Sequence, residues 1–431
     1  MKKNAVVLGG GGSKGAYEVG VFKALKKLNY SYDIITGTSV GSINGAVISQ
    51  GDFSLCEKFW KNINTSDVFD LETDSRSPEL LREYAKSAFG NNGLSYNNLK
   101  NNLTLFIDEE KLRKSDIEFG LVTVKFPSMT PLYIYKEDME KGKVIDYILA
   151  SAACFPAMKP HKIGNQLYID GGYNDNIPID MAIEKGATTI VAVDLNAIGV
   201  VKNKKYDNVK IIKVESYCDL GNFLVFDKNI AKKNIKLGYL DTLKAFKKAE
   251  GYRYTFKTGE TSKIISDINH ISEDMFYNFK KNNKRLLPVI NKTIKKTLNT
   301  RGKSSKDLSK KEYSVLIYES LMEFLSIPNF EIYTKKKCDF LIKKNFKNIK
   351  TDNIKKLDEI INNLKLSGDI LKKLDELSLT IKNIEKTEII KFICDNINLE
   401  DKKVNHFLAL LSLVSPLEFS CGVYMYIFNL K

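Results

Sequence analysis

Short runs of apolar residues alternate with helical patterns through the first 250 residues of the chain. Ala5–Leu8 is a continuous apolar run, as expected of a strand buried on both faces of a parallel sheet. Lys14–Leu28 then places apolar residues at helical spacing. Asp33–Thr36 and Ser39–Ser49 repeat this order of strand and helix. Further strands are expected at Phe119–Val124, Leu132–Tyr135, Leu167–Ile169, Thr189–Asp194 and Val209–Val214. The alternation predicts an α/β fold with a mainly parallel central sheet, covered by helices on both faces.

The pattern changes beyond about Gly251. Glycine becomes sparse, and apolar residues recur at helical spacing, as at Ile354, Leu357 and Ile361. We therefore expect two domains, a catalytic α/β domain over residues 1–255 and an all-α region over residues 256–431.

Composition narrows the class of protein. The 431 residues are 43% apolar and 28% charged, which excludes a wholly disordered chain and a polytopic membrane protein. The formal net charge is +15, of which residues 1–250 carry +4 and the remainder +11. A basic surplus of this kind favours contact with anionic partners, such as acidic lipid headgroups, although a solvated lysine-rich surface explains it equally well.

The apolar segment Phe407–Phe428 has nearly the length of a membrane span. Pro416, Glu418 and Gly422 lie within it, and a central acidic residue opposes insertion. We expect two short core helices broken at Ser415 and Pro416. The six cysteines form no CxxC pair and no signal peptide is recognisable at the N-terminus, so we expect a cytoplasmic protein with reduced thiols.

The glycine run Gly9–Gly12 is followed by Ser13, Lys14 and Gly15, between an expected strand and an expected helix. Glycines let backbone N–H groups converge on an anion, and a helix N-terminus adds positive potential. A phosphate-binding P-loop requires GxxxxGK[ST] and does not fit, because Gly15 is followed by alanine. A dinucleotide GxGxxG can be matched, which leaves a nucleotide-binding module as an alternative.

The second motif is Gly37-Thr38-Ser39-Val40-Gly41, which has the GxSxG pattern of a nucleophile elbow. The expected strand before it and helix after it provide the context that the motif requires. Such a turn places the serine hydroxyl at its tip, and the following helix directs its N-terminus at a developing oxyanion. Ser39 is therefore a candidate nucleophile.

The third motif is Asp170-Gly171-Gly172, at the end of the expected strand Leu167–Ile169. A carboxylate held at a strand end can accept a proton from a serine that the fold brings close. Only three histidines occur, which leaves a Ser-His-Asp triad few sources for its base. His161 is one of them, nine residues before Asp170, and we expect a loop or surface role for it.

Together the motifs GGGGSKG, GTSVG and DGGYNDNIP resemble the patatin-like phospholipase family, in the family's order. The tract Ser151–Pro160 also resembles the family's stretch upstream of the aspartate, and the likeness spans about residues 5–195. One departure is Lys14, where many members carry arginine. The resemblance implies a three-layer sandwich and a Ser-Asp dyad, with no metal and no cofactor.

The resemblance also assigns roles to individual residues. It implies that Ser39 is the nucleophile and Asp170 the base. It implies oxyanion-hole N–H groups from Gly10, Gly11, Gly12 and Ser13, to which Val40 could add one, and a loop-orienting or anion-attracting role for Lys14. The remaining motif glycines are Gly15, Gly37, Gly41, Gly171 and Gly172.

The expected activity is hydrolysis of an acyl ester in a phospholipid or lysophospholipid. An acyltransferase using the same dyad is the alternative within the enzymes, because sequence does not reveal whether water or another acceptor takes the acyl group. The basic C-terminal region predicts peripheral contact with an anionic membrane surface, at the inner face of the membrane, and no nucleic acid is expected.

Overall fold

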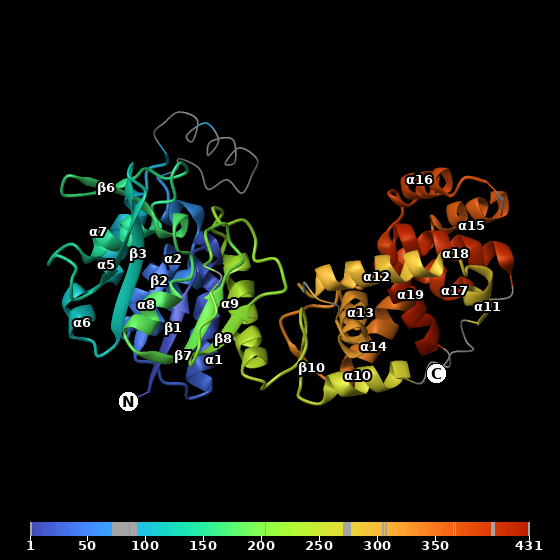
Figure 1. The fold of residues 1–431 in the computed structure, drawn as a ribbon, viewed down its shortest axis with the longest axis horizontal. Helices are drawn as coiled ribbons and strands as arrows, with labels where there is room; N and C mark the ends of the chain where they lie inside the picture. The colour runs from blue at the N-terminus through green and yellow to red at the C-terminus, as the bar shows by residue number, and fades with distance from the viewer. Residues whose placement is uncertain are drawn as a thin grey trace. The chain divides into compact units, whose positions relative to one another are not determined.

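The chain folds into two compact units, Met1–Lys247 and Lys248–Lys431 (Figure 1). Our sequence-based boundary lies a few residues later, between residues 255 and 256. The computed structural model describes residues 2–70, 86, 93–202, 204–269, 277–303, 306, 308–364, 366, 368–397 and 401–429.

The first unit is built on a central sheet, which has eight strands in the described residues, in the order β5-β6-β3-β2-β1-β7-β8, with β4 also paired to β3. Strands β3, β2, β1, β7 and β8 are parallel, whereas β4 and β6 run antiparallel to β3, and β5 antiparallel to β6. The strands are β1 Lys3–Leu8, β2 Ile34–Thr38, β3 Glu118–Phe126, β4 Thr130–Tyr135, β5 His161–Ile163, β6 Gln166–Asp170, β7 Ala187–Asp194 and β8 Lys210–Glu215.

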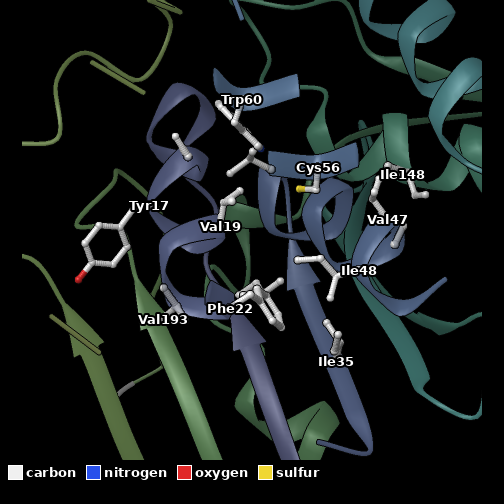
Figure 2. Packing of buried hydrophobic residues seen from close by; sticks show 14 of the residues in the cluster. Tyr17, Val19, Phe22, Ile35, Val47, Ile48, Cys56, Trp60, Ile148 and Val193 are labelled. Carbon is white, nitrogen blue, oxygen red and sulfur yellow. The ribbon is translucent and has the colours of Figure 1, made fainter. Parts of the chain in front are cut away.

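Helices cover both faces of this sheet, so the unit has three layers. Alternate residues of β1 enter two different apolar clusters: Val6 and Leu8 pack with the residues of α1 (Ala16–Lys27), and Ala5 and Val7 with those of α8 (Ile179–Glu184). Figure 2 shows the first of these clusters, in which side chains of α1, β2 and α2 gather on one side of the sheet. The α/β fold with a mainly parallel sheet is thereby confirmed.

The remaining helices of this unit are shorter than α9, which packs along α1. A 3₁₀ turn, η1, precedes α1, so the helix begins two residues later than the sequence pattern indicates. The three-residue strand β5 was not predicted, because so short a segment carries no readable periodicity. These elements are η1 Gly12–Gly15, α2 Val40–Ser49, α3 Phe53–Asn62, η2 Thr65–Asp67, α5 Asn97–Phe106, α6 Glu109–Lys114, α7 Val144–Ala152, η3 Gly171–Tyr173 and α9 Lys228–Ala245.

The second unit is helical, as expected, apart from a two-residue parallel pair between β9 (Thr255–Phe256) and β10 (Ile332–Tyr333). Its core consists of two apolar clusters, to which α17 and α19 both contribute. The helices are α10 Glu260–Asn269, α11 Tyr277–Asn282, α12 Leu287–Arg301, α13 Lys310–Phe324, α14 Lys335–Lys347, α15 Ile354–Asn363, α16 Ile370–Ile381, α17 Lys386–Asn396, α18 Lys402–Val414 and α19 Pro416–Asn429.

The apolar segment near the C-terminus forms two helices, α18 and α19, which meet at Ser415. Phe407, Leu411 and Cys421 are fully buried in the core of the unit. Within the described part of the chain, no helix combines the length and the apolar character that crossing a membrane requires. The interpretation of this segment as core helices fits that burial.

Candidate active site

Ser39 lies at the sharp turn between β2 and α2. Its backbone has φ 56° and ψ −124°, a conformation that is strained for a residue with a side chain and is typical of a nucleophile elbow. The flanking glycines permit the turn by their lack of a side chain. A Cβ at Gly37 would lie 2.4 Å from the Gly41 carbonyl oxygen, and one at Gly41 would lie 2.6 Å from the Leu8 carbonyl oxygen.

Strand register brings Asp170 beside Ser39. Thr38 pairs with Val122 of β3, and Asp170 pairs with the next residue of that strand, Thr123. The Ser39 side chain lies close enough to the Asp170 carboxyl group to favour its charged form and so to lower the pKa of that group. Gly171 lies so close to β3 that a Cβ there would be 2.2 Å from the Val122 carbonyl oxygen. The third motif therefore fits against the strand that separates it from the elbow.

The Asp170 carboxyl group is buried, and this burial raises its pKa to about 6. The nearby Ser39 side chain and a hydrogen bond from the Gly172 N–H, at 2.8 Å, oppose the shift by stabilising the charged form. Asp170 is thus still largely ionised at neutral pH, yet it holds a proton more strongly than an ordinary aspartate. These are the properties that a general base needs.

A buried serine on α7, Ser151, holds the elbow in place through hydrogen bonds. The backbone N–H of Ser39 donates to the Ser151 hydroxyl oxygen at 3.0 Å, and that hydroxyl donates to the Val122 carbonyl at 2.6 Å. Ser151 therefore ties the nucleophile to β3, the strand that also holds Asp170. It lies within the tract that resembles the family, but no sequence pattern indicates this role.

The glycine-rich loop runs past Ser39, and its backbone N–H groups divide into two sets. The N–H of Gly10 donates to the Asn176 carbonyl at 3.1 Å, and that of Ser13 donates to the Phe223 carbonyl at 2.8 Å. Among the described residues, no acceptor is recorded for the N–H groups of Gly11 and Gly12. Of the four oxyanion-hole donors that the family resemblance predicts, those of Gly10 and Ser13 are therefore already engaged within the protein, and the oxyanion hole itself stays a prediction.

Ser13 and Lys14 instead hold neighbouring segments in place. The Ser13 hydroxyl donates to the Asn222 carbonyl at 2.7 Å, and the Lys14 ammonium group donates to the Asn196 carbonyl at 3.1 Å. Gly12 has φ 55°, and a Cβ there would lie 2.1 Å from the Phe223 carbonyl oxygen, so only glycine fits this position. A Cβ at Gly15 would lie 2.4 Å from the Val40 side chain, so the loop approaches α2 more closely than a side chain at this position would allow.

Asn176, which the sequence did not single out for a role, connects the loop to the third motif. It is buried, and its side-chain amide donates to the Gly10 carbonyl at 3.4 Å. Its backbone N–H donates to the Val200 carbonyl, while the Val200 N–H donates to the Gly172 carbonyl. The glycine loop, the Asp170 motif and the segment after β7 are therefore held together around one residue.

Ser39 and Asp170 face a cavity of about 680 Å³. Gly10, Gly11, Gly12, Val40 and Gly172 also line it. The other walls are almost entirely apolar and come from α3, the segment after η2, α5, the end of α7 and the segments after β7 and β8. Those walls include Phe59, Trp60, Val68, Phe69, Leu99, Phe155, Met158, Phe223 and Phe226.

Apolar side chains at the edge of the cavity are open to solvent. Ile198 is 91% exposed, Val200 50% and Tyr173 42%, yet all three line the cavity. Exposed apolar residues gathered at the rim of a pocket are typical of a surface that meets another apolar phase. In the described residues, no cluster of three or more His, Cys, Asp or Glu side chains could hold a metal ion.

His161 lies on β5, and both of its ring nitrogens have partners. Nδ1 lies 3.0 Å from the Tyr96 hydroxyl oxygen, and Nε2 lies 3.0 Å from a carboxylate oxygen of Asp146. Burial lowers the pKa of His161 below its ordinary value. It is buried on a strand, rather than in the loop or surface position that we expected, and both of its nitrogens contact residues other than Ser39.

Comparison with known proteins agrees with this geometry. Residues 6–183 match the sequence model of the patatin-like phospholipases. The first unit, which contains these residues, belongs to the patatin-like phospholipase family. The family is one of lipid acyl hydrolases, and the match covers the elbow, the glycine loop and the Asp170 motif within one stretch.

The relatives of this patatin-like domain are distant. Over 200 residues the chain is 28% identical to the human patatin-like phospholipase domain-containing protein 6, with 45% of this chain and 13% of that protein covered. It is also 28% identical over 200 residues to lysophospholipase nte1 of Aspergillus fumigatus, covering 45% and 12%. The chain thus matches about an eighth of the length of these relatives. VipD of Legionella pneumophila aligns structurally over 98% of this chain and 92% of its own, with 11% identity and a TM-score of 0.38.

Proposed function

We propose that the patatin-like domain hydrolyses the acyl ester of a phospholipid or lysophospholipid, with Ser39 as nucleophile and Asp170 as general base. The observation that carries this proposal is the position of Ser39 on a strained elbow, beside the buried Asp170 carboxyl group, where both residues line a mostly apolar cavity. In this dyad the Asp170 carboxylate accepts the Ser39 proton directly, so no histidine is needed as the base.

In the first half of the reaction, Asp170 accepts the hydroxyl proton of Ser39 while Oγ attacks the ester carbonyl carbon. The tetrahedral intermediate then collapses, and the leaving alcohol takes the proton from Asp170. In the second half, Asp170 accepts a proton from water while the water oxygen attacks the acyl-enzyme carbonyl carbon. The bond to Ser39 Oγ then breaks, Ser39 takes the proton back from Asp170, and the fatty acid is released. The raised pKa of Asp170 favours both proton transfers, because a stronger base accepts the proton more readily.

We propose that the oxyanion is held by the backbone N–H groups of Gly11 and Gly12, with that of Val40 at the N-terminus of α2. All three residues line the cavity beside Ser39. Among the described residues, none of the three N–H groups has a recorded acceptor, so each can turn to the substrate oxygen without losing a hydrogen bond. Donors arranged before the reaction in this way stabilise the charge at little reorganisation cost.

The cavity supports a lipid substrate. Its volume lies within the range of pockets that bind small molecules, and its aromatic and aliphatic walls suit an acyl chain. The exposed rim residues Ile198 and Val200 are suited to contact with the apolar region of a membrane from which a lipid is drawn. We place the reaction at a membrane surface for this reason.

Fluorophosphonate labelling with mass-spectrometric site mapping tests the proposal. The reagent is expected to modify Ser39, and Ser39→Ala should lose both labelling and release of fatty acid from mixed micelles. Ser128→Ala, in the turn before β4, is the control and should behave as wild type. Labelling that persists in Ser39→Ala, or tight dinucleotide binding with no labelling at all, would contradict the proposal.

A further inference from the structure

Helix α14 of the second unit has two contrasting faces. Cys338, Ile342 and Phe346 recur every four residues and are buried in the core. The opposite face is exposed, and its residues are spaced so that Phe340 lies among lysines. We call these residues the outer face of α14: Lys336, Phe340, Lys343, Lys344 and Lys347.

The lysines of this outer face differ from their neighbours in having no acidic partner. Lys335 pairs with Asp339 at 2.7 Å, and Lys337 pairs with Glu331 at 2.6 Å. No carboxylate within the described part of the chain lies in salt-bridge distance of Lys336 or of the three lysines that follow Phe340 on this face. The outer face therefore keeps four positive charges for an external partner.

Phe340 is 66% exposed at the centre of this group. A phenyl ring exposed to water lacks the favourable free energy that burial in an apolar environment would provide. A ring surrounded by lysines suits a bilayer surface, where the ammonium groups contact phosphates and the ring enters the acyl boundary. The phosphates of a nucleic acid would also pair with the lysines, but a nucleic acid offers Phe340 a smaller apolar environment than the acyl region of a bilayer.

We propose that the outer face of α14 docks the protein on an anionic lipid bilayer. The lysines would supply attraction to the headgroups, at about fivefold in affinity for each lysine, the factor that corresponds to about 1 kcal/mol. Insertion of Phe340 would add about tenfold. This surface lies in the second unit and uses no residue of the proposed catalytic cavity, so docking and hydrolysis can be tested separately.

The experiment is co-sedimentation of the full chain with vesicles of phosphatidylcholine alone and of an equal mixture of phosphatidylcholine and phosphatidylglycerol. One variant replaces Lys336, Lys343, Lys344 and Lys347 with glutamine. The matched control replaces four exposed lysines on helices of the first unit with glutamine, which changes the net charge equally: Lys26, Lys27, Lys232 and Lys233. A third variant is Phe340→Ser.

Wild type is expected to bind the anionic vesicles and not the neutral ones. The α14 variant should bind more than a hundredfold more weakly, the control only a few-fold, and Phe340→Ser about tenfold. All variants should hydrolyse a short soluble ester at the wild-type rate, which separates failure of docking from failure of the proposed catalysis. Equal losses in both lysine variants, or α14-dependent binding to duplex DNA without binding to vesicles, would overturn the proposal.

Discussion

Two buried titratable groups lie on neighbouring strands of the sheet, and only one of them reaches the cavity. Asp170 ends β6 and lies beside Ser39, whereas His161 begins β5 and contacts Tyr96 and Asp146. Burial raises the pKa of Asp170 to about 6 and lowers that of His161, because burial disfavours the charged form of each group. The difference teaches that a pKa shifted by burial does not identify the base here. Access to the nucleophile does.

The comparison predicts opposite results for substitutions at the two residues, and the reverse pattern would contradict it. Asp170→Asn should lower kcat for a soluble ester by about 10²–10⁴-fold, because the variant has no base to accept the Ser39 proton. Its stability should not fall, since asparagine can still accept the Gly172 N–H and removes a buried charge. Ester hydrolysis and thermal unfolding measure the two effects.

His161→Asn should give the opposite result. It removes two buried contacts and should lower the free energy of unfolding by about 1–3 kcal/mol, while leaving kcat near that of wild type. A loss of kcat in a folded His161→Asn variant that matches the loss in Asp170→Asn would make the histidine part of the catalytic apparatus.

The glycine loop allows a second contrast, between N–H groups that are engaged and those that face the cavity. Gly11→Ala should lower kcat by about ten- to a hundredfold with little change in KM, because its Cβ would lie 2.8 Å from Leu195 and displace a proposed oxyanion donor. Gly164→Ala, in the turn between β5 and β6, is the control: its Cβ would meet nothing within 4 Å, but its φ of 56° disfavours alanine, so this variant should lose some stability and keep the wild-type kcat. Wild-type kcat in Gly11→Ala would remove Gly11 from the oxyanion hole.

The pH profile sharpens the comparison further. With Asp170 as base, kcat/KM for a soluble ester should fall about tenfold for each pH unit below about 6, because the protonated carboxyl group cannot accept a proton. An unperturbed aspartate would place this fall near pH 4. The profile of His161→Asn decides the origin of the limb, which should remain near pH 6 in that variant. A limb that disappears with the histidine would assign the titration to it.

The residues of the candidate site could be predicted from the sequence, but the hydrogen bonds that distinguish their roles could not. The strands and the elbow were predictable because buried parallel strands and GxSxG turns have short, local patterns, as at Ala5–Leu8 and Gly37–Gly41. The engaged N–H groups of Gly10 and Ser13 were not, since their acceptors, Asn176 and Phe223, lie far along the chain. The same reason hides the support of Ser39 by Ser151, because its consequence appears only when α7 packs on β3.

Glu18 on α1 extends the comparison to a third buried group, one with no access to the cavity. It is fully buried beneath α2, its carboxylate accepts from the Asn44 side-chain amide at 2.7 Å, and burial raises its pKa to about 8. The folded protein therefore keeps the proton between about pH 4.5 and 8, where the unfolded chain has released it. Stability from this group must fall as pH rises through that interval, and level off above it.

Glu18→Gln should remove this dependence, since glutamine stays neutral and can still accept from Asn44. The melting temperature of the variant relative to wild type is expected to increase from pH 5 to pH 8, and kcat for a soluble ester should stay unchanged at both. This is the smallest of the expected effects, because it changes neither the cavity nor the loop. A relative melting temperature that stays constant from pH 5 to pH 8 would mean that Glu18 is already ionised in the folded protein across this range, and burial would then not govern its proton.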